Sequence, residues 1–407
     1  MDSGAWLVYQ KGWKSGRRKA STGFRPKGAR GMSNVETLNP ATGDRFHPDP
    51  ERSYTLEARY YIEPEIYERE KAAIFYRGWS FACHAGQVSE PGAYTEFRAA
   101  DQNLFAIRGK DGKLRAFYNV CSHRAHELVR GSGTKTVITC PYHAWSYHAD
   151  GRLRSARGSE KVAGFDAEEF CLKQVQLEEI AGFVFVNLDP EAPSLASQTQ
   201  GLEAEMRRYC PEIDKLKFAY RLTYEIEANW KNVVDNYLEC YHCATAHPAF
   251  ADLVDISKYR SVTYGIHSSH IAPAGRADNT AYSFDGGDGT PNSFAGWWLW
   301  PNLTLNIFPG PPNITTLHII PTGPETTLEH FDFYFLESEP SAGEREAIEY
   351  MDKVLQPEDI GLVESVQRRL HSRGYRQGRF MVDAARSHLS EHAVHHFHNL
   401  VMNALRT

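Results

Sequence analysis

Three features are scarce in this 407-residue chain, and each scarcity excludes a class of protein. No stretch approaches 18 uninterrupted apolar residues, so a membrane-spanning helix is not expected. Seven cysteines are too few for a disulfide scaffold, and their number is typical of a reducing, cytoplasmic compartment. The formal net charge of −6 gives no general attraction for nucleic acid or an anionic membrane. A soluble intracellular protein is therefore expected, and its length predicts two packed domains or one large domain with an inserted module.

The first residues differ in composition from the rest of the chain. Residues 1–31 carry eight lysines or arginines against a single acid, Asp2. Such a basic segment is typical of a leader or tail, and no apolar run of an export signal follows Arg17-Arg18. We expect residues 1–34 to be a basic leader outside the folded domains.

Two patterns divide the next part of the chain. Residues 56–79 have helical periodicity, which predicts a helical lead-in over residues 35–78. Beyond it, short alternating runs are cut by a dipeptide that favours tight hairpins. That dipeptide occurs at Asp111-Gly112 and Asp150-Gly151. The pattern predicts a small antiparallel β domain over residues 79–190.

Longer helices and strands alternate in the second half. Strand-like runs cover residues 260–272, 302–308, 313–320 and 326–337. Helical runs cover residues 198–210, 230–244, 341–371 and 387–405. The fold class is therefore predicted as α+β, with a helix-grip-like domain over residues 191–407 in which helices pack on one antiparallel sheet. The last helix is rich in histidine and is expected to be solvated or to face another subunit.

The small β domain contains two Cys-His pairs. Cys121-x-His123 is followed, after sixteen residues, by Cys140-x-x-His143. Two cysteines and two histidines can bind zinc or an iron–sulfur cluster. Zinc fingers usually place both cysteines in one loop and both histidines in the other, whereas each loop here supplies one of each. This division favours a two-iron cluster in which two thiolates hold one iron and two imidazoles the other.

A second constellation lies in the helical run of residues 230–244 and just beyond it. His242 and His247 are five residues apart, or about 140° around an ideal helix, so both face one ion only if the helix ends between them. Pro248 supplies a reason, because the residue before proline is pushed out of helical geometry. The pair therefore predicts a mononuclear metal site.

Two imidazoles need a carboxylate to complete the facial triad that leaves open positions on Fe(II). Several acids are available, and their spacing does not choose among them. The candidates are Asp235, Glu239, Glu358, Asp359 and Glu364.

Together the two constellations resemble those of the Rieske non-haem iron oxygenases, the ring-hydroxylating oxygenase alpha subunits, over residues 40–407. The resemblance implies a β domain that binds a [2Fe-2S] cluster and a catalytic domain that binds a mononuclear Fe(II). The implied cluster ligands are Cys121, His123, Cys140 and His143. The implied iron ligands are His242, His247 and Asp359, the last from a late helix.

The resemblance also implies a carboxylate bridge between subunits. In this family an acid three residues before the first iron histidine links it to a cluster histidine of the neighbouring subunit in a homotrimer. That acid is Glu239 here, and Asp235, one turn earlier, is expected to support the site. Most members have Asp at the bridge, whereas the run Glu-Cys-Tyr-His-Cys is similar to the subgroup acting on quaternary ammonium compounds.

This resemblance implies an O2-dependent monooxygenase. The expected reaction is oxidative N-demethylation of stachydrine with release of formaldehyde. The alternatives are cleavage of carnitine to trimethylamine and demethylation of glycine betaine. The sequence has no flavin or nicotinamide fingerprint and no plant-type ferredoxin motif. A separate flavin and iron–sulfur reductase is therefore expected to supply electrons from NAD(P)H.

Aromatic residues are the expected binding groups for such a substrate. A quaternary ammonium nitrogen carries no proton to donate, so aromatic faces must hold it by cation–π attraction. Candidate rings gather on what should be the sheet of the catalytic domain and beside the predicted iron helix. They are Trp297, Trp298, Trp300, Tyr237 and Tyr241. A donor from Arg, Lys, Asn or Tyr is expected opposite them, to receive the carboxylate of a betaine.

Overall fold

The computed structural model describes residues 45–285 and 292–406. The basic leader predicted over residues 1–34 lies outside these residues. The described part is α+β as predicted, with two seven-stranded sheets and one three-stranded sheet, all antiparallel. None of its helices has the length and apolar character needed to cross a bilayer.

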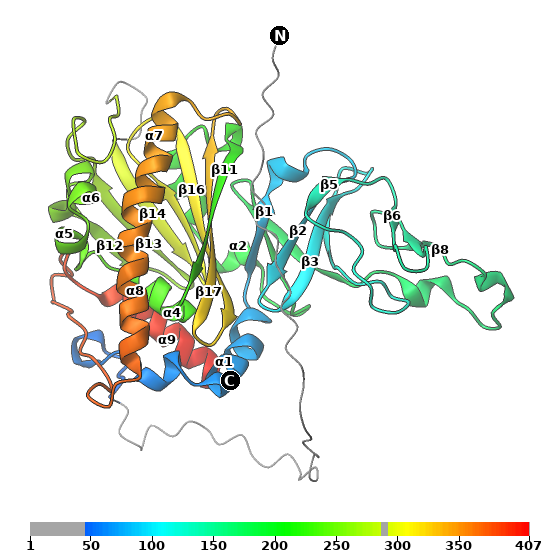
Figure 1. Cartoon of the computed structure of the whole chain (residues 1–407), viewed down its shortest axis with the longest axis horizontal. Coiled ribbons are helices and arrows are strands. Elements are labelled where there is room, and N and C mark those ends of the chain that lie inside the picture. Colours follow the sequence, from blue (N-terminus) through cyan, green and yellow to red (C-terminus); the bar gives the residue numbers. More distant parts are fainter. Residues whose placement is uncertain (1–44, 286–291, 407) are drawn as a thin grey trace, which may run out of the picture. The chain divides into compact units, whose positions relative to one another are not determined.

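The lead-in segment is helical from Ala58 onward. A 3-10 turn (Ala58–Tyr61) precedes α1 (Pro64–Glu70), and a π-helical turn (Lys71–Phe75) follows it. Pro64 stands at the start of α1, where its missing N–H costs no hydrogen bond. The segment packs against the last helix, α9 (His392–Arg406). Helix α1 and the π-helical turn therefore lie beside α9, near the other end of the described chain (Figure 1).

Hydrogen bonds join this lead-in to α9. The Arg69 guanidinium donates to the Leu405 carbonyl oxygen at 2.7 Å, and the Leu56 N–H donates to His398 Nδ1 at 3.2 Å. His392, His395 and His398 are all buried. The expectation that the histidines of this helix are solvated or face another subunit is therefore wrong for these three, because they pack into the protein's own interior.

The smaller domain has one larger sheet, of order β1-β10-β9-β4-β3-β2-β5, and a small sheet of order β6-β7-β8. Its strands are β1 (Ser80–His84), β2 (Ala93–Ala99), β3 (Gln102–Arg108), β4 (Leu114–Tyr118), β5 (Ser132–Thr134), β6 (Ile138–Thr139), β7 (Ser146–Tyr147), β8 (Leu153–Ser155), β9 (Gln174–Ile180) and β10 (Phe183–Asn187). Gly112 turns β3 into β4 at a φ of +76°, and Gly151 turns β7 into β8 at +88°. Both hairpins were predicted from their Asp-Gly pairs, and glycine tolerates the positive φ that such turns require.

The larger domain is built on a sheet of order β11-β17-β16-β15-β14-β13-β12. Its strands are β11 (Lys217–Ile226), β12 (Arg260–Thr263), β13 (His267–Pro273), β14 (Ser293–Leu299), β15 (Leu303–Ile307), β16 (Asn313–Gly323) and β17 (Thr326–Phe335). Strands β11 and β14 were not among the predicted runs. β11 is an edge strand whose residues are mostly exposed or half-buried, so it lacks a strong apolar alternation.

The two faces of this sheet pack against different partners. One face meets β1 and β10 of the smaller domain together with α2 (Leu195–Gln198) and α3 (Leu202–Tyr209). Alternate residues of β14 divide between the faces, so that Trp297 and Leu299 join this core. Phe294 joins the opposite core, which lies under the helices and includes Phe331.

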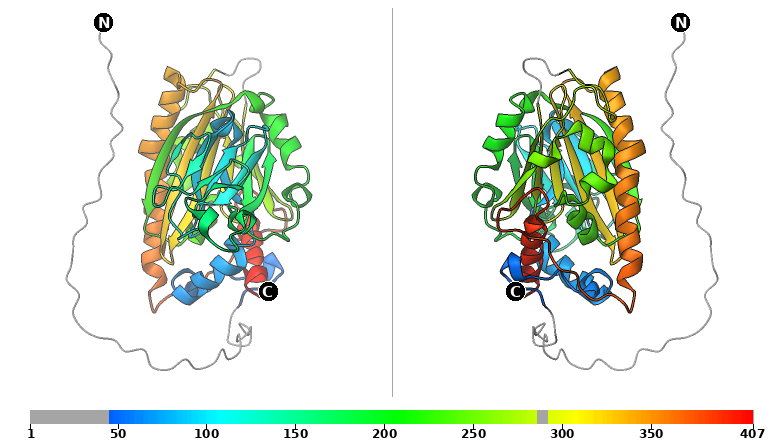
Figure 2. Two further views of the ribbon diagram at one scale, coloured as in Figure 1. Left: turned by 90° about the vertical axis from the view of Figure 1, so that its right-hand side faces the viewer. Right: turned by 90° about the vertical axis from the view of Figure 1, so that its left-hand side faces the viewer.

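A long helix runs along that second face (Figures 1 and 2). It comprises α7 (Ala342–Tyr350), a π-helical turn (Met351–Leu355) and α8 (Gln356–Leu370). Ser341 caps α7 in a capping box with Glu344. The π-helical turn immediately precedes the acidic first turn of α8, and such turns occur frequently at functional sites.

A fully buried ion pair joins the lead-in to α4 (Trp230–Tyr237), the helix that leads to the predicted iron histidines. Lys231 Nζ and Glu70 Oε1 lie 2.6 Å apart, and both side chains are 0% exposed. The Trp230 indole N–H donates to the other oxygen of Glu70 at 2.9 Å.

Removing the acid of this pair should destabilise the protein strongly. Glu70→Ala leaves the Lys231 ammonium buried without a partner, and its expected cost is about 3–5 kcal/mol in the free energy of unfolding. The double variant Glu70→Leu/Lys231→Met removes both charges and should regain most of the loss. Urea unfolding followed by tryptophan fluorescence measures both effects, and an unchanged midpoint for Glu70→Ala would contradict the assignment.

Candidate active site

The two predicted iron histidines flank a short helix instead of sharing the long one. The predicted helix over residues 230–244 stops at Tyr237, and a separate turn, α5 (Cys243–Ala246), lies between the histidines. His247 has φ −124° and ψ 67°, which is outside helical geometry, and Pro248 opens α6 (Pro248–Leu253). The break expected before Pro248 is present, and it turns both imidazoles to one side.

His242, His247 and Asp359 meet at one point, although Asp359 is more than 100 residues further along the chain. The Nε2 atoms of the two histidines are 3.1 Å apart. Asp359 Oδ1 lies 2.9 Å from the Nε2 of His247 and 3.7 Å from that of His242. Ligand atoms about 2.1 Å from one ion and at right angles to each other are about 3 Å apart. The three donors therefore fit one face of a metal's coordination sphere.

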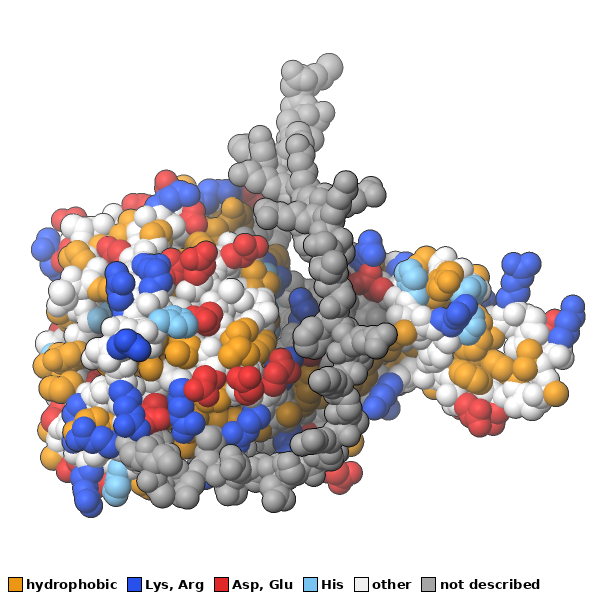
Figure 3. Space-filling model, turned by 60° about the horizontal axis from the view of Figure 1, so that its bottom comes forward, with side chains coloured by type: hydrophobic (Ala, Val, Ile, Leu, Met, Phe, Trp, Pro, Cys, Tyr) orange, Lys and Arg blue, Asp and Glu red, His pale blue; other side chains and the backbone are white. Residues whose placement is uncertain are grey.

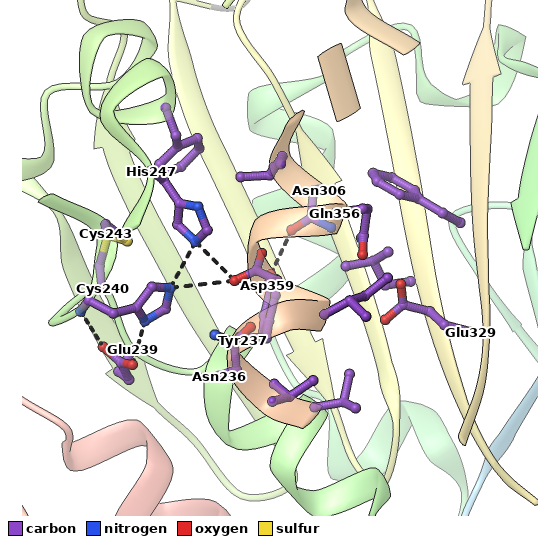
Figure 4. Close-up of a pocket in the computed structure, with 18 of the residues that line it drawn as sticks. Asn236, Tyr237, Glu239, Cys240, Cys243, His247, Asn306, Glu329, Gln356 and Asp359 are labelled. Carbon is purple, nitrogen blue, oxygen red and sulfur yellow. Dashed lines mark hydrogen bonds and ion pairs between the residues drawn. A yellow bond between two sulfur atoms is a disulfide. The ribbon is translucent and has the colours of Figure 1, made fainter. Parts of the chain in front are cut away.

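Two further carboxylates orient the imidazoles, and one of them, Glu239, is shown in Figure 4. His247 Nδ1 lies 2.8 Å from Glu358, and His242 Nδ1 lies 2.5 Å from Glu239 Oε1. Each carboxylate accepts the Nδ1 proton, which leaves the Nε2 lone pair free to bind a metal. Glu239 also accepts the backbone N–H groups of Tyr241 and His242, so its own position is fixed.

The remaining two acids have other partners. Asp235 accepts hydrogen bonds from the Tyr61 hydroxyl at 2.7 Å and from His398 Nε2 at 2.9 Å. Glu364 accepts the backbone N–H of Glu227 at 3.1 Å. Asp235 thus fixes α4 against the lead-in and α9 and makes no hydrogen bond to the two site histidines.

The acids around His247 also change its protonation. Burial lowers its pKa, but hydrogen bonds and charge from Asp359 and Glu358 outweigh burial and raise the pKa to about 9. A protonated imidazole cannot bind a metal, so a metal ion must displace this proton when it binds.

A disulfide closes the segment that holds His242. Cys240 and Cys243 are bonded, whereas the other five cysteines of the chain are free. Nothing in the sequence marks this single bond, because a Cys-x-x-Cys spacing is equally typical of metal sites and redox pairs.

The cysteines and histidines of the two Cys-His pairs lie on a pair of loops with the same backbone form. In one, the Ala125 N–H donates to the Cys121 carbonyl oxygen, and in the other the Ala144 N–H donates to that of Cys140, both at 3.0 Å. Both alanines have positive φ, 56° and 60°. The two loops therefore present their side chains in matching ways.

Among these four side chains, the two cysteines are buried and the two imidazoles lie nearer to solvent. Cys121 and Cys140 are each 2% exposed, whereas His123 is exposed and His143 is half-buried. The two imidazole rings are 4.6 Å apart, and His123 stacks on Trp145. Figure 3 shows histidine and hydrophobic side chains together on the surface of the smaller domain. The donor set fits a cluster with one buried, thiolate-bound iron and one imidazole-bound iron near solvent.

A cavity opens beside the triad, between α8 and the sheet. His242, His247 and Asp359 all line it, and its volume is about 110 Å³. This is several times the space that a single water requires, so a small organic molecule can enter. Six aromatic residues contribute to its wall. They are Tyr237, Phe250, Tyr259, Phe294, Phe308 and Phe331.

The three tryptophans predicted to line the pocket lie elsewhere, so this part of the prediction is wrong. Trp297 faces the opposite side of the sheet and donates its indole N–H to Glu205 at 3.0 Å. Trp298 and Trp300 pack against Phe397 of α9. Strand alternation and the position of α9 decide where these side chains lie.

Of the two tyrosines predicted to line the pocket, only Tyr237 does so. Tyr237 lines the cavity and donates its hydroxyl hydrogen to Asn306 Oδ1 at 2.6 Å. Tyr241 is 45% exposed and is not among the residues that line the cavity. Most of the rings that do line it come from strands and loops that the sequence did not mark as part of a site.

Comparison with known proteins agrees with both constellations. Residues 78–166 match the Rieske [2Fe-2S] domain, and residues 213–407 match the ring hydroxylating alpha subunit (catalytic domain). The carnitine monooxygenase oxygenase subunit of Escherichia coli (strain K12) is 43% identical over 365 residues, which are 89% of this chain and 97% of the relative. The chloroplastic choline monooxygenase of Beta vulgaris is 33% identical over 87% of this chain and 78% of the relative.

Solved structures agree with these relatives. The structure of a quaternary ammonium Rieske monooxygenase superposes with a TM-score of 0.84 at 41% identity, covering 89% of this chain and 98% of that one. The fold and site define a Rieske-type oxygenase, an oxidoreductase that uses O2 with a [2Fe-2S] cluster and a mononuclear iron. The chain belongs to the family of Rieske ring-hydroxylating oxygenase alpha subunits.

Glu358→Ala should lower the affinity for iron by about 10–100-fold, because it removes the acceptor that orients His247. Iron content after competition with a chelator measures the change. Glu364→Ala is the matched control, since Glu364 lies on the same helix and is bonded to the Glu227 backbone. Equal iron retention in the two variants would contradict an orienting role for Glu358.

Proposed function

We propose that the chain is the oxygenase component of a two-component monooxygenase that oxidises a quaternary ammonium compound. Carnitine cleavage with release of trimethylamine is the reaction favoured, because carnitine monooxygenase subunits are 42–43% identical over nearly their whole length. The observation that carries the substrate class is the aromatic cavity beside the His242, His247 and Asp359 triad. Each aromatic face in contact with a quaternary ammonium group contributes about 0.5–2 kcal/mol.

We assign the ligands as the sequence implied. His242, His247 and Asp359 would hold the iron, and Cys121, His123, Cys140 and His143 would hold the cluster. When bound, these groups supply O2 activation and single electrons. The chain's own residues do the rest: Glu358 and Glu239 hold the imidazole protons on Nδ1, and the aromatic wall excludes water from the reacting substrate.

The reaction balances with two electrons from a reductase. One oxygen atom of O2 enters a C–H bond next to nitrogen, and the other leaves as water with two electrons and two protons. The hydroxylated carbon then releases the amine as its C–N bond breaks, giving trimethylamine and an aldehyde. The same step on an N-methyl group would give formaldehyde and a tertiary amine, so stachydrine demethylation is the alternative reaction.

Electron transfer between subunits of a homotrimer is part of this proposal. Glu239 and His242 line a second hollow as well as the main cavity. The exposed imidazole of His123 lies at the surface of the smaller domain. A cluster histidine of a neighbouring subunit can dock at this hollow and donate a hydrogen bond to Glu239. NAD(P)H would reach the enzyme only through a separate flavin and iron–sulfur reductase.

Products distinguish the two reactions. The purified protein should be brown and hold about three irons per chain. With reductase, NADH and O2, carnitine should give trimethylamine, while stachydrine gives little formaldehyde. Glycine betaine and choline are the other two candidate substrates to be assayed in the same way. A colourless, zinc-binding preparation would exclude the oxygenase, and formaldehyde from stachydrine as the dominant product would favour the alternative.

Glu239→Ala should abolish turnover while both iron centres remain. Assays at saturating iron separate this effect from weaker metal binding, because Glu239 also orients His242. Electron paramagnetic resonance checks both centres, and single-turnover mixing with reduced cluster measures electron delivery. Normal turnover in this variant would remove the bridging role.

A further inference from the structure

One acid interrupts the apolar inward face of β17. Residues 327, 329, 331, 333 and 335 of this strand point toward the helices, and three of them are phenylalanines. Glu329 occupies the second of these positions and is 2% exposed. It lines the same cavity as the triad, and Figure 4 shows its carboxylate directed from β17 toward α8.

Glu329 has no cationic partner in the described part of the protein. Its Oε1 atom is buried and makes no hydrogen bond there. No arginine or lysine is among the described residues that line the cavity. The titratable groups that act on it are Asp359 of α8 and, across the strand pair, Tyr224 of β11, and neither is cationic.

Burial is therefore the main influence on the pKa of this carboxyl. Burial first, and then the charge of Asp359, raise the pKa of Glu329, while the Gln356 side chain lowers it, and the net pKa is about 8. A buried carboxylate is unfavourable unless a positive charge accompanies it. The imidazole of His247 also lines the cavity, but it is paired with Glu358 and Asp359 and loses its proton when a metal binds. A cationic ligand is therefore the available source of charge for Glu329.

The surroundings identify the kind of cation. A metal ion needs several oxygen or nitrogen donors around it, whereas Glu329 is accompanied mainly by aromatic and aliphatic side chains such as Phe331, Phe308 and Ile319. Aromatic faces with a single carboxylate suit an organic cation that carries no N–H group. The carbon oxidised in the proposed reaction is bonded to that nitrogen, so the group that fixes the nitrogen also fixes the bond that reacts.

We propose that Glu329 is the counter-ion of the substrate's quaternary ammonium group and determines which ammonium compounds are accepted. The inference rests on the proposed function for the class of substrate. Glu329 would repel a carboxylate on the substrate, and the repulsion is stronger the closer that carboxylate lies to the substrate's nitrogen. Choline has none, and carnitine keeps its carboxylate three carbons away. Glycine betaine and stachydrine carry theirs on the carbon next to nitrogen and are disfavoured.

Calorimetric binding to the anaerobic iron-loaded enzyme tests this role. The ligands are choline, carnitine, glycine betaine and 3,3-dimethylbutan-1-ol, the uncharged carbon analogue of choline. Glu329→Gln should weaken choline and carnitine binding by roughly 30-fold, leave the uncharged analogue unchanged or tighter, and reduce the preference for carnitine over glycine betaine. Wild-type binding at pH 7 should also release about one proton, which the variant does not.

Two further variants control for structure. Glu329→Asp keeps the charge and should keep the preference for cations, which guards against a variant that merely misfolds. Glu364→Gln removes an acid from the same helix–sheet unit outside the cavity and should bind like wild type. Wild-type-like binding of cations by Glu329→Gln would overturn the counter-ion role while the proposed function stands. A wild-type enzyme that binds no quaternary ammonium compound would overturn both.

Discussion

The site depends on one long-range contact, the docking of the first turn of α8 against His247. Two consecutive acids act there on one imidazole: Glu358 accepts its Nδ1 proton and Asp359 meets its Nε2. Since His242 and His247 are separated only by α5, fixing His247 against α8 also fixes the pair. The long helix is in turn held on the sheet by the aromatic core that includes Phe331 and Met351. Without this packing the histidines would remain a local motif with no third donor.

Local signals in the sequence predicted what local geometry controls. The Asp-Gly hairpins, the break before Pro248 and the two Cys-His loops all follow from residues close together in the chain. Residue spacing left five acids open as the third donor, and only the family resemblance pointed to Asp359. The choice among them is made by tertiary contacts, because α8 brings Asp359 and Glu358 to the histidines while Asp235 is held by Tyr61 and His398.

The cavity was harder to predict, and the reason is the geometry of the sheet. A tryptophan-rich run looks like an aromatic cage until the strand's faces are assigned, and one step along β14 separates Trp297 from the site. Glu329 left a readable signal, an acid in phase with phenylalanines on β17, but its meaning depends on which face the long helix covers. Which residues line the cavity therefore depends more on strand register, and on which layer covers each face of the sheet, than on short sequence motifs.

The π-helical turn Met351–Leu355 has a consequence for how this helix can evolve. A π turn holds one residue more than an α turn, and each residue of an α-helix advances the side chains by about 100°. The extra residue thus determines how the side chains of α8 are rotated about the helix axis relative to those of α7. The apolar face of α7 packs on the sheet in either case. Losing a single residue there would leave the core of α7 intact and rotate the acids of α8 away from the histidines. Chain length at this point is consequently as constrained as the identity of the ligands.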